Sequence, residues 1–177
     1  MGEKNDKVNI DLASEIASYN IDGKWNDYIG VQKNVIETLR NEKFFDNNTV
    51  TNDDSGMVIR ITAKGIKETL GTGKRFQSLP RKLKELKIAT LRNLPDIIKS
   101  GVVLHDNVKN YYSKNGDLFA YIESDIVINN TIYGVRVSIK KKVGSNVFWI
   151  HHIDTKKIPV YSTLPERRNL KRTEILK

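Results

Sequence analysis

Residues 131–153 read TIYGVRVSIKKKVGSNVFWIHHI, and this stretch decides the fold. Its first part, Thr131 to Lys140, places apolar side chains at every second position, which is the period of a β-strand with one buried face. Gly144-Ser145 then predicts a turn. The residues that follow, 146–154, contain the most apolar run of the chain and predict an antiparallel return strand that carries His151 and His152.

The sequence before this hairpin extends it into a meander. Leu118 to Ile128 has the composition of a strand. Asn129-Asn130 is a two-residue turn of the kind that tolerates positive φ. Val102-Val103-Leu104 predicts one further, shorter strand.

Helical patterns precede the sheet. Ala63 to Leu70 predicts a short helix that stops at Gly71 and Gly73. We expect Ser78 to cap the next helix, with Pro80 in its first turn. Its apolar stripe comprises Leu83, Leu86, Ile88, Leu91 and Leu94, and a further turn runs from Pro95 to Gly101. The expected fold is α+β, with N-terminal helices packed on one face of a roughly four-stranded antiparallel sheet.

The chain is expected to divide into three parts. Residues 1–55 form an acidic N-terminal helical and linker segment, residues 56–160 a basic α+β nuclease-like domain, and residues 161–177 a basic tail. Within the first part, residues 26–45 predict a helix capped by Asn26 or Asp27, with Ile29, Val35, Ile36, Leu39 and Phe44 as its apolar positions. Residues 46–56 have the composition of a linker, so the segment is expected to be separable.

Charge is distributed unevenly along the chain. The 177 residues carry a net charge of +9, but residues 1–60 hold 7 Lys and Arg against 11 Asp and Glu, whereas residues 61–177 hold 23 against 10. A strongly basic half favours a polyanionic partner, and RNA is the expected one. The oligomeric state stays open.

The sequence also excludes several classes of protein. No apolar run approaches the ~20 residues that span a bilayer, and no signal peptide is visible, so we expect no membrane partner and a cytoplasmic or delivered protein. Without cysteine there is neither a disulfide framework nor a thiolate zinc site. Gly71-Thr72-Gly73-Lys74 fails as a phosphate loop because Arg75 follows where Ser or Thr is required. We expect no cofactor and no metal.

Histidine carries the candidate chemistry because its pKa lets it accept and donate a proton near neutrality. Adjacent residues of a strand point to opposite faces, so one of His151 and His152 is expected to face the open side of the sheet. His151 is the first choice for the catalytic base and His152 the second, although periodicity does not decide between them. The competing interpretation is a pair of half-buried histidines at a strand end with no chemistry.

The neighbouring strand supplies candidate phosphate ligands. Arg136, Ser138 and Lys140 alternate with the apolar residues and are expected on the open face. The guanidinium of Arg136 can bind a phosphate with two hydrogen bonds. Trp149, Phe148 and Tyr133 offer either a stacking surface for a base or ordinary core packing.

Four motifs appear in a characteristic order: 61–70 (ITAKGIKETL), 91–100 (LRNLPDIIKS), 132–140 (IYGVRVSIK) and 148–152 (FWIHH). Over residues 57–157 the chain resembles the phage-type and large polyvalent-protein-associated domains of the barnase–EndoU–colicin–RelE nuclease fold. The resemblance implies helices on one face of a four-stranded sheet and metal-independent RNase chemistry on the other. It points to Lys64, Lys67, Thr69, Arg136 and the histidine pair as site residues. Gly71 departs from the small hydroxyl residue expected there.

These observations lead to two alternative functions. The first is a metal-independent endoribonuclease, or a toxin-like RNase domain of a phage or mobile element, in which the ribose 2′-oxygen attacks the adjacent phosphate. Catalysis would fall to His151, His152, Arg136 and Thr69, and RNA binding to Lys64, Lys67, Lys74, Arg75 and Lys140. The second is a non-catalytic nucleic-acid-binding or protein-interaction module. An immunity or antitoxin protein is an expected partner of a toxin, and the acidic first 55 residues are a candidate cover for the basic face.

Overall fold

The computed structural model describes residues 8–70, 74–109, 116–142 and 144–157. Within these ranges the elements follow one another as β1 (Val8–Ile10), α1 (Leu12–Ser18), α2 (Tyr28–Asn41), β2 (Thr49–Thr51), β3 (Val58–Arg60), α3 (Ala63–Leu70), α4 (Lys74–Ser78), α5 (Arg81–Thr90), a 3₁₀ turn η1 (Leu91–Asn93), α6 (Leu94–Ser100), β4 (Val102–Lys109), β5 (Leu118–Ile128), β6 (Thr131–Lys141) and β7 (Val147–Lys157). In the described part of the chain, no helix has the length and apolar character needed to cross a membrane.

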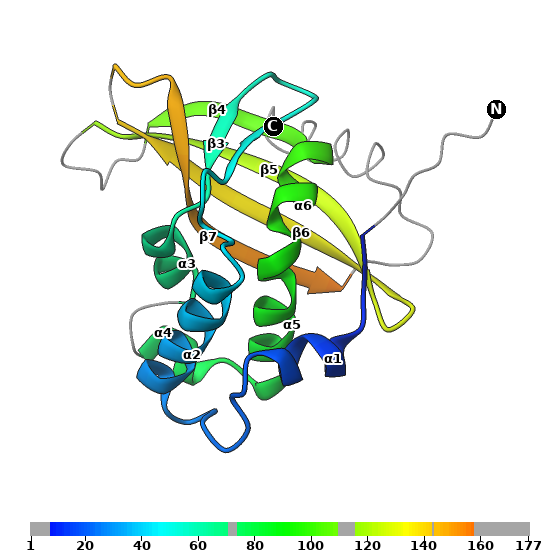
Figure 1. The fold of residues 1–177 in the computed structure, drawn as a ribbon. Helices are drawn as coiled ribbons and strands as arrows, with labels where there is room; N and C mark the ends of the chain where they lie inside the picture. The colour runs from blue at the N-terminus through cyan, green and yellow to red at the C-terminus, as the bar shows by residue number, and fades with distance from the viewer. Residues whose placement is uncertain (1–7, 71–73, 110–115, 143, 158–177) are drawn as a thin grey trace.

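The sheet is larger than the expected meander and is mixed. The antiparallel strands β4, β5, β6 and β7 are present in sequence order, which confirms the α+β class. The prediction of four antiparallel strands is wrong, because β1 and β3 add parallel to β5 and β7, and β2 pairs with β3. The order is β1-β5-β6-β7-β3-β2, with β4 also on β5, in a sheet of seven strands (Figure 1).

The central hairpin follows the local chemistry of its residues. Leu118–Ile128 and Thr131–Lys141 pair residue for residue down to Ile128 and Thr131. Asn129 and Asn130 make the connection with φ of 47° and 64°, as a two-residue turn with left-handed backbone requires. Along β6 the alternate residues Val135, Val137 and Ile139 are buried, which confirms the expected apolar face.

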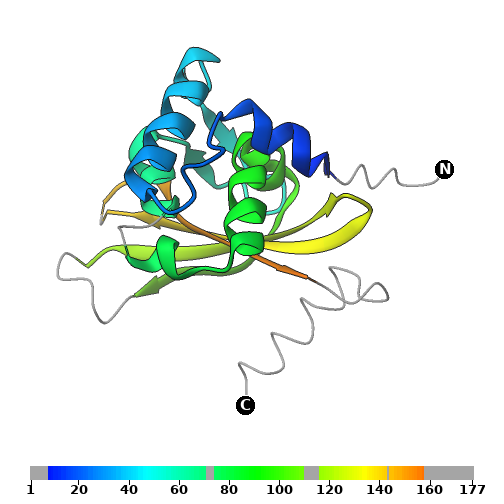
Figure 2. The same ribbon diagram turned by 90° about the horizontal axis from the view of Figure 1, so that it is seen from below.

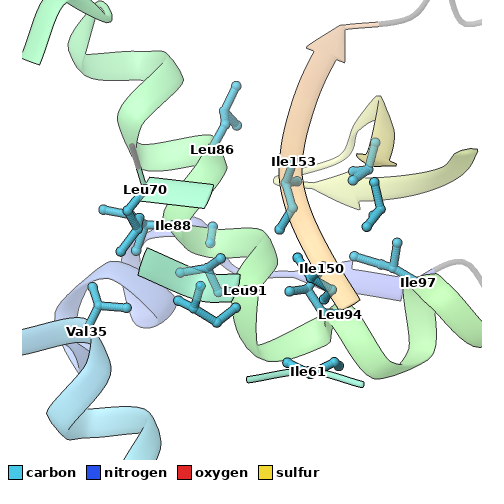
Figure 3. Packing of buried hydrophobic residues seen from close by; sticks show 14 of the residues in the cluster. Val35, Ile61, Leu70, Leu86, Ile88, Leu91, Leu94, Ile97, Ile150 and Ile153 are labelled. Atoms are coloured by element: carbon cyan, nitrogen blue, oxygen red, sulfur yellow. The ribbon is translucent and has the colours of Figure 1, made fainter. Parts of the chain in front are cut away.

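Helices cover one face of this sheet, and the core lies between them and the strands (Figure 2). The cluster combines Val35 of α2 with Leu91 and Ile97 of the later helices and Ile150 and Ile153 of β7 (Figure 3). Burial of one such aliphatic side chain stabilises by roughly 1.5–3 kcal/mol, so this interface contributes substantially to the stability of the fold.

The helix predictions are confirmed in type and corrected in detail. Ala63–Leu70 is helical over its expected bounds, and Asp27 caps α2 by accepting the Gly30 N–H at 3.0 Å. Ser78 ends α4 instead of capping α5, which begins after Pro80 without a side-chain cap. Ile29 and Leu83, expected in apolar stripes, are exposed. Each lies in the first turn of its helix.

The expected linker, residues 46–56, contains a strand and a buried anchor. Thr49–Thr51 forms β2, so the composition was misleading here. Asn52 is fully buried, and its Nδ2 donates to the carbonyls of Ile98 and Gly101 at 2.7 and 2.8 Å. Its Oδ1 accepts from the N–H and hydroxyl of Ser55. The side chain thereby satisfies carbonyls at the end of α6 that the helix leaves without partners.

Residues on both sides of the expected boundary at 55/56 therefore belong to one sheet and one hydrophobic cluster. The division into three parts and the separability of the first part stay predictions about folding. The expected tail, 161–177, lies outside the described residues.

Arg92 of η1 ties the N-terminal helices to the later ones. Its guanidinium binds both carboxylate oxygens of Glu42, at 2.9 and 2.8 Å, and also contacts Glu15 and the Ser18 hydroxyl. The group lies 4.9 Å from the ring centre of Tyr19, whose pKa burial raises above its ordinary range. The paired contact with the two Glu42 oxygens is the bidentate geometry that arginine alone provides.

Candidate functional site

A β-bulge at His151 shapes the candidate site. Ile139 of β6 faces Ile150 of β7, but the next residue back, Ser138, faces His152, so His151 is an extra residue in the ladder. The bulge lets Ile150 and Ile153 both enter the core. It also brings His151 and His152 to the lining of a single groove, whereas an uninterrupted strand would have separated them. The expectation of opposite faces is therefore wrong.

The groove runs along β7 between this strand and α3, α4 and α5, and we call it the histidine groove. Its volume is about 730 Å³. The residues that line it are Glu68, Leu70, Phe76, Ser78, Leu79, Leu83, Lys87, His151, His152, Ile153, Asp154 and Thr155. Polar and apolar residues both line it, and two of its carboxylates, Glu68 and Asp154, contact the two imidazoles.

His151 is held by a carboxylate from α3. Its Nδ1 lies 3.3 Å from Glu68 Oε2, and its ring stands edge-on to Phe119 with centroids 5.5 Å apart. The same Glu68 oxygen lies 3.7 Å from Lys140 Nζ. With Nδ1 turned to the carboxylate, Nε2 is the second nitrogen of the ring and the one that Glu68 leaves unengaged. The side chain is 40% exposed, so solvent and ligands reach it.

His152 has a carboxylate partner of its own. Its Nε2 lies 3.0 Å from Asp154 Oδ1, two residues further along the strand. The hydrogen bond from His152, aided by the charges of His152, Lys87 and Arg136, lowers the pKa of Asp154 against the opposing effect of burial. Asp154 is thus kept ionised beside the imidazole.

The position of Glu68 depends on a close approach between α3 and β7. Strand β3 pairs with β7 only as far as Trp149, and α3 then covers the strand edge. A Cβ atom on Gly65 would lie 2.8 Å from the carbonyl oxygen of Ile150, so only glycine fits there. Thr62 Oγ1 accepts the Gly65 N–H at 3.0 Å and orients the start of the helix.

The expected site residues are partly assembled. Lys140 reaches Glu68 and so lies beside His151. Arg136 does not line the groove: its Nε and Nη2 donate to Glu123 Oε1 at 3.0 and 2.8 Å, and Glu123 is buried. In the ladder Arg136 faces Asp154.

Thr69 does not belong to the surface of the site. It is fully buried on the core side of α3, so its hydroxyl cannot meet RNA. Lys64 and Lys67 are exposed on the same helix, and Lys64 lines a pocket. Lys74 and Arg75 begin α4, and their side chains lie outside the described residues.

The aromatic residues divide between core and surface. Tyr133 and Phe148 are buried in the hydrophobic cluster, as the core-packing interpretation predicts. Trp149 is half-buried and lines a second pocket beside Lys140.

Glu68 and Lys87 were not identified from the sequence. Glu68 is 83 positions from His151, and nothing in its neighbours distinguishes it from a solvated helix residue. Lys87 is buried beside the apolar stripe of α5, and its charge acts on Asp154. Among residues 8–70, 74–109, 116–142 and 144–157, no group of three or more His, Cys, Asp or Glu side chains is placed to hold a metal ion.

The groove thus combines two imidazoles, each hydrogen-bonded to a carboxylate, with nearby ammonium groups. Such an arrangement is suited to proton transfer to and from an anionic ligand.

Comparison with known proteins identifies one matching family model, described as large polyvalent protein-associated domain 3, over residues 31–148. No curated protein and no solved structure matches the chain. The matched region begins in α2 and ends in β7, three residues before His151.

Proposed function

The chain belongs to the large polyvalent protein-associated domain 3 family, and on this premise we propose that it is a metal-independent endoribonuclease. The proposal includes the suggestion that its sheet is a variant of the barnase–EndoU–colicin–RelE nuclease fold. Its main support is the bulge that places His151 and His152, each with a carboxylate partner, along one groove.

The proposed reaction is an intramolecular transesterification at a phosphate of the RNA backbone. His151 Nε2 accepts the proton of the ribose 2′-hydroxyl, and the 2′-oxygen attacks the adjacent phosphorus. The bond from phosphorus to the 5′-oxygen of the next nucleotide breaks, and protonated His152 supplies the proton to that oxygen. The products are a 2′,3′-cyclic phosphate and a 5′-hydroxyl, so atoms and charge balance.

The remaining groups support this step without forming bonds to the RNA. Glu68 orients His151 and stabilises the imidazolium that forms, and Asp154 does the same for His152. Lys140, close to Glu68, is assigned to the charge that develops on the phosphate. Arg136 is bound by Glu123 and is assigned an indirect role, in which its positive charge helps to keep Asp154 ionised.

The test is incubation of the purified chain with single-stranded, structured and transfer RNA in EDTA. We expect cleavage with 2′,3′-cyclic ends, and a loss of roughly 10²–10⁴-fold in His151→Ala and His152→Ala. Glu68→Gln should lose activity while retaining the fold. The matched control is His105→Ala: His105 is the third histidine and lies in β4, opposite Tyr121 of β5. Intact RNA with the wild-type chain, or equal activity in all three histidine variants, would refute the proposal.

The second candidate function is a non-catalytic RNA-binding module. It is favoured by the lysines gathered around Trp149, which need no chemistry to bind RNA. On this alternative the wild-type chain binds RNA and leaves it intact, and the histidine substitutions alter affinity alone. An immunity or antitoxin protein as partner stays a prediction of the toxin interpretation.

A further inference from the structure

A second pocket lies on the other side of Glu68 from the histidine groove. Glu68 lines both, so the two hollows adjoin at this side chain. The second pocket has a volume of about 550 Å³, and its lining includes Lys64, Lys140, Lys141, Lys142 and Trp149. We call it the lysine–tryptophan pocket. Its size is in the range of small-ligand sites.

Charge and an aromatic surface are combined in this pocket. Lys142 Nζ lies 5.7 Å from the ring centre of Trp149, and Lys141 Nζ lies 5.0 Å from that of Phe148. Lys140 faces Trp149 in the strand ladder. Lys64 approaches from the start of α3, where it is exposed. The Lys142 ammonium therefore lies near the indole, and Lys64 and Lys140 line the same pocket, where they would bind the phosphates on either side of a stacked base.

The spacing along β7 relates the two sites. Trp149 and His151 are two residues apart, which corresponds to roughly 6–7 Å along a strand. This is the scale of a single nucleotide. A base on Trp149 would therefore belong to the nucleotide next to a phosphate held at His151.

We propose that the lysine–tryptophan pocket binds one unpaired nucleotide of single-stranded RNA, with its base on Trp149 and its phosphates on Lys64 and Lys140. This inference rests on the proposed ribonuclease function and names the substrate class. A base within a duplex is already stacked and paired, so it cannot lie on the indole. The pocket therefore selects single-stranded RNA at the position beside the cleaved phosphate.

The test measures binding apart from cleavage. A 2′-O-methyl oligoribonucleotide has no 2′-hydroxyl to attack phosphorus, so it reports affinity alone. In the otherwise wild-type chain, Trp149→Ala should weaken binding of a labelled oligonucleotide by about 5- to 150-fold, the range expected for loss of one stacked base. Trp149→Phe should recover most of the affinity. Lys64→Ala should also weaken binding, whereas Lys33→Ala, at an exposed lysine of α2 outside the pocket, should not.

A spectroscopic readout locates the base. Trp25 is only 6% exposed, and Trp25→Phe leaves Trp149 as the sole tryptophan. Single-stranded 2′-O-methyl oligonucleotide should quench its emission, and the same strand in a duplex should not. Equal quenching by both, or unchanged affinity in Trp149→Ala, would overturn the inference.

Failure of the two proposals can be told apart. If Trp149 binds the single strand but natural RNA stays intact, the ribonuclease proposal fails and the nucleotide pocket stands. If RNA is cleaved and Trp149→Ala behaves as wild type in both assays, the pocket is refuted and the ribonuclease stands.

Discussion

Replacing Gly65 by alanine tests the close approach of α3 to β7, on which the position of Glu68 depends. The added Cβ atom would lie 2.8 Å from the Ile150 carbonyl oxygen and 3.4 Å from Ile150 Cβ. Ordinary contact begins near 3.4 Å, so the helix must withdraw by about 0.6 Å. The contact is with backbone in the middle of a strand, which cannot rotate out of the way.

The expected effect on stability has an unusual sign. In an exposed helix, Gly→Ala stabilises by ~0.5–1 kcal/mol because alanine has the higher helix propensity. Overpacking of a tight contact costs ~1–3 kcal/mol. The difference predicts net destabilisation of about 1 kcal/mol for Gly65→Ala, which corresponds to a fall in Tm of roughly 2–4 °C for a chain of this size.

The effect should also reach the site. Withdrawal of α3 lengthens the 3.3 Å contact between Glu68 and His151, so the imidazole resonances of His151 should shift and RNA cleavage should fall. Urea or thermal unfolding measures the first effect and NMR the second. Lys33→Ala is the control because its side chain is exposed on α2 and belongs to no candidate site. A Gly65→Ala chain as stable as wild type, with unchanged His151 resonances, would refute the reasoning.

Four further predictions concern charge and anchoring. The Asp154 carboxyl should titrate below the ordinary pKa of ~3.9, and His152→Ala should raise the Asp154 pKa; NMR titration checks both. The stabilisation that ionised Asp154 contributes is fully present above its pKa in the unfolded chain and is lost as pH falls through its lower pKa in the folded chain. Arg92→Lys should lower the free energy of unfolding by about 1–2 kcal/mol, because an ammonium cannot bind both Glu42 oxygens; equal denaturation midpoints would contradict this. Asn52→Ala should cost ~1–3 kcal/mol and open residues 46–56 to proteolysis, since two carbonyls lose their donor. RNA affinity should fall with salt with a log–log slope near −3, as about four phosphate contacts on single strands imply, and an affinity independent of salt would exclude the basic pocket as the binding surface.

Local periodicity determined those elements whose own residues settle their conformation. Ala63–Leu70 and Leu118–Ile128 have the bounds expected from the sequence, and Asn129-Asn130 turns as expected. In each case the information is contained within a few neighbouring residues: an apolar stripe, an alternation, or side chains that tolerate positive φ. The basic second half of the chain and the apolar face of β6 could likewise be predicted from the local sequence.

Tertiary structure decided the remainder. Strands β1 and β2 have three residues each, too few to show a period, and they are strands because a neighbour supplies their hydrogen bonds. The β-like composition of residues 57–62, by contrast, does predict β3. Asn52 looks like a linker residue until the end of α6 is brought to it.

The site shows the same division. The sequence alone predicted His151, His152 and Lys140 as candidate site residues from their residue type, because few side chains transfer protons or bind phosphate at neutral pH. It assigned the two histidines to opposite faces, as an unbroken strand requires. The bulge that reverses this arises because Ile150 and Ile153 must both reach the core, and the approach of Glu68 arises because Gly65 lets α3 lie on the backbone of β7. Both depend on contacts between segments distant in sequence, which no local pattern records.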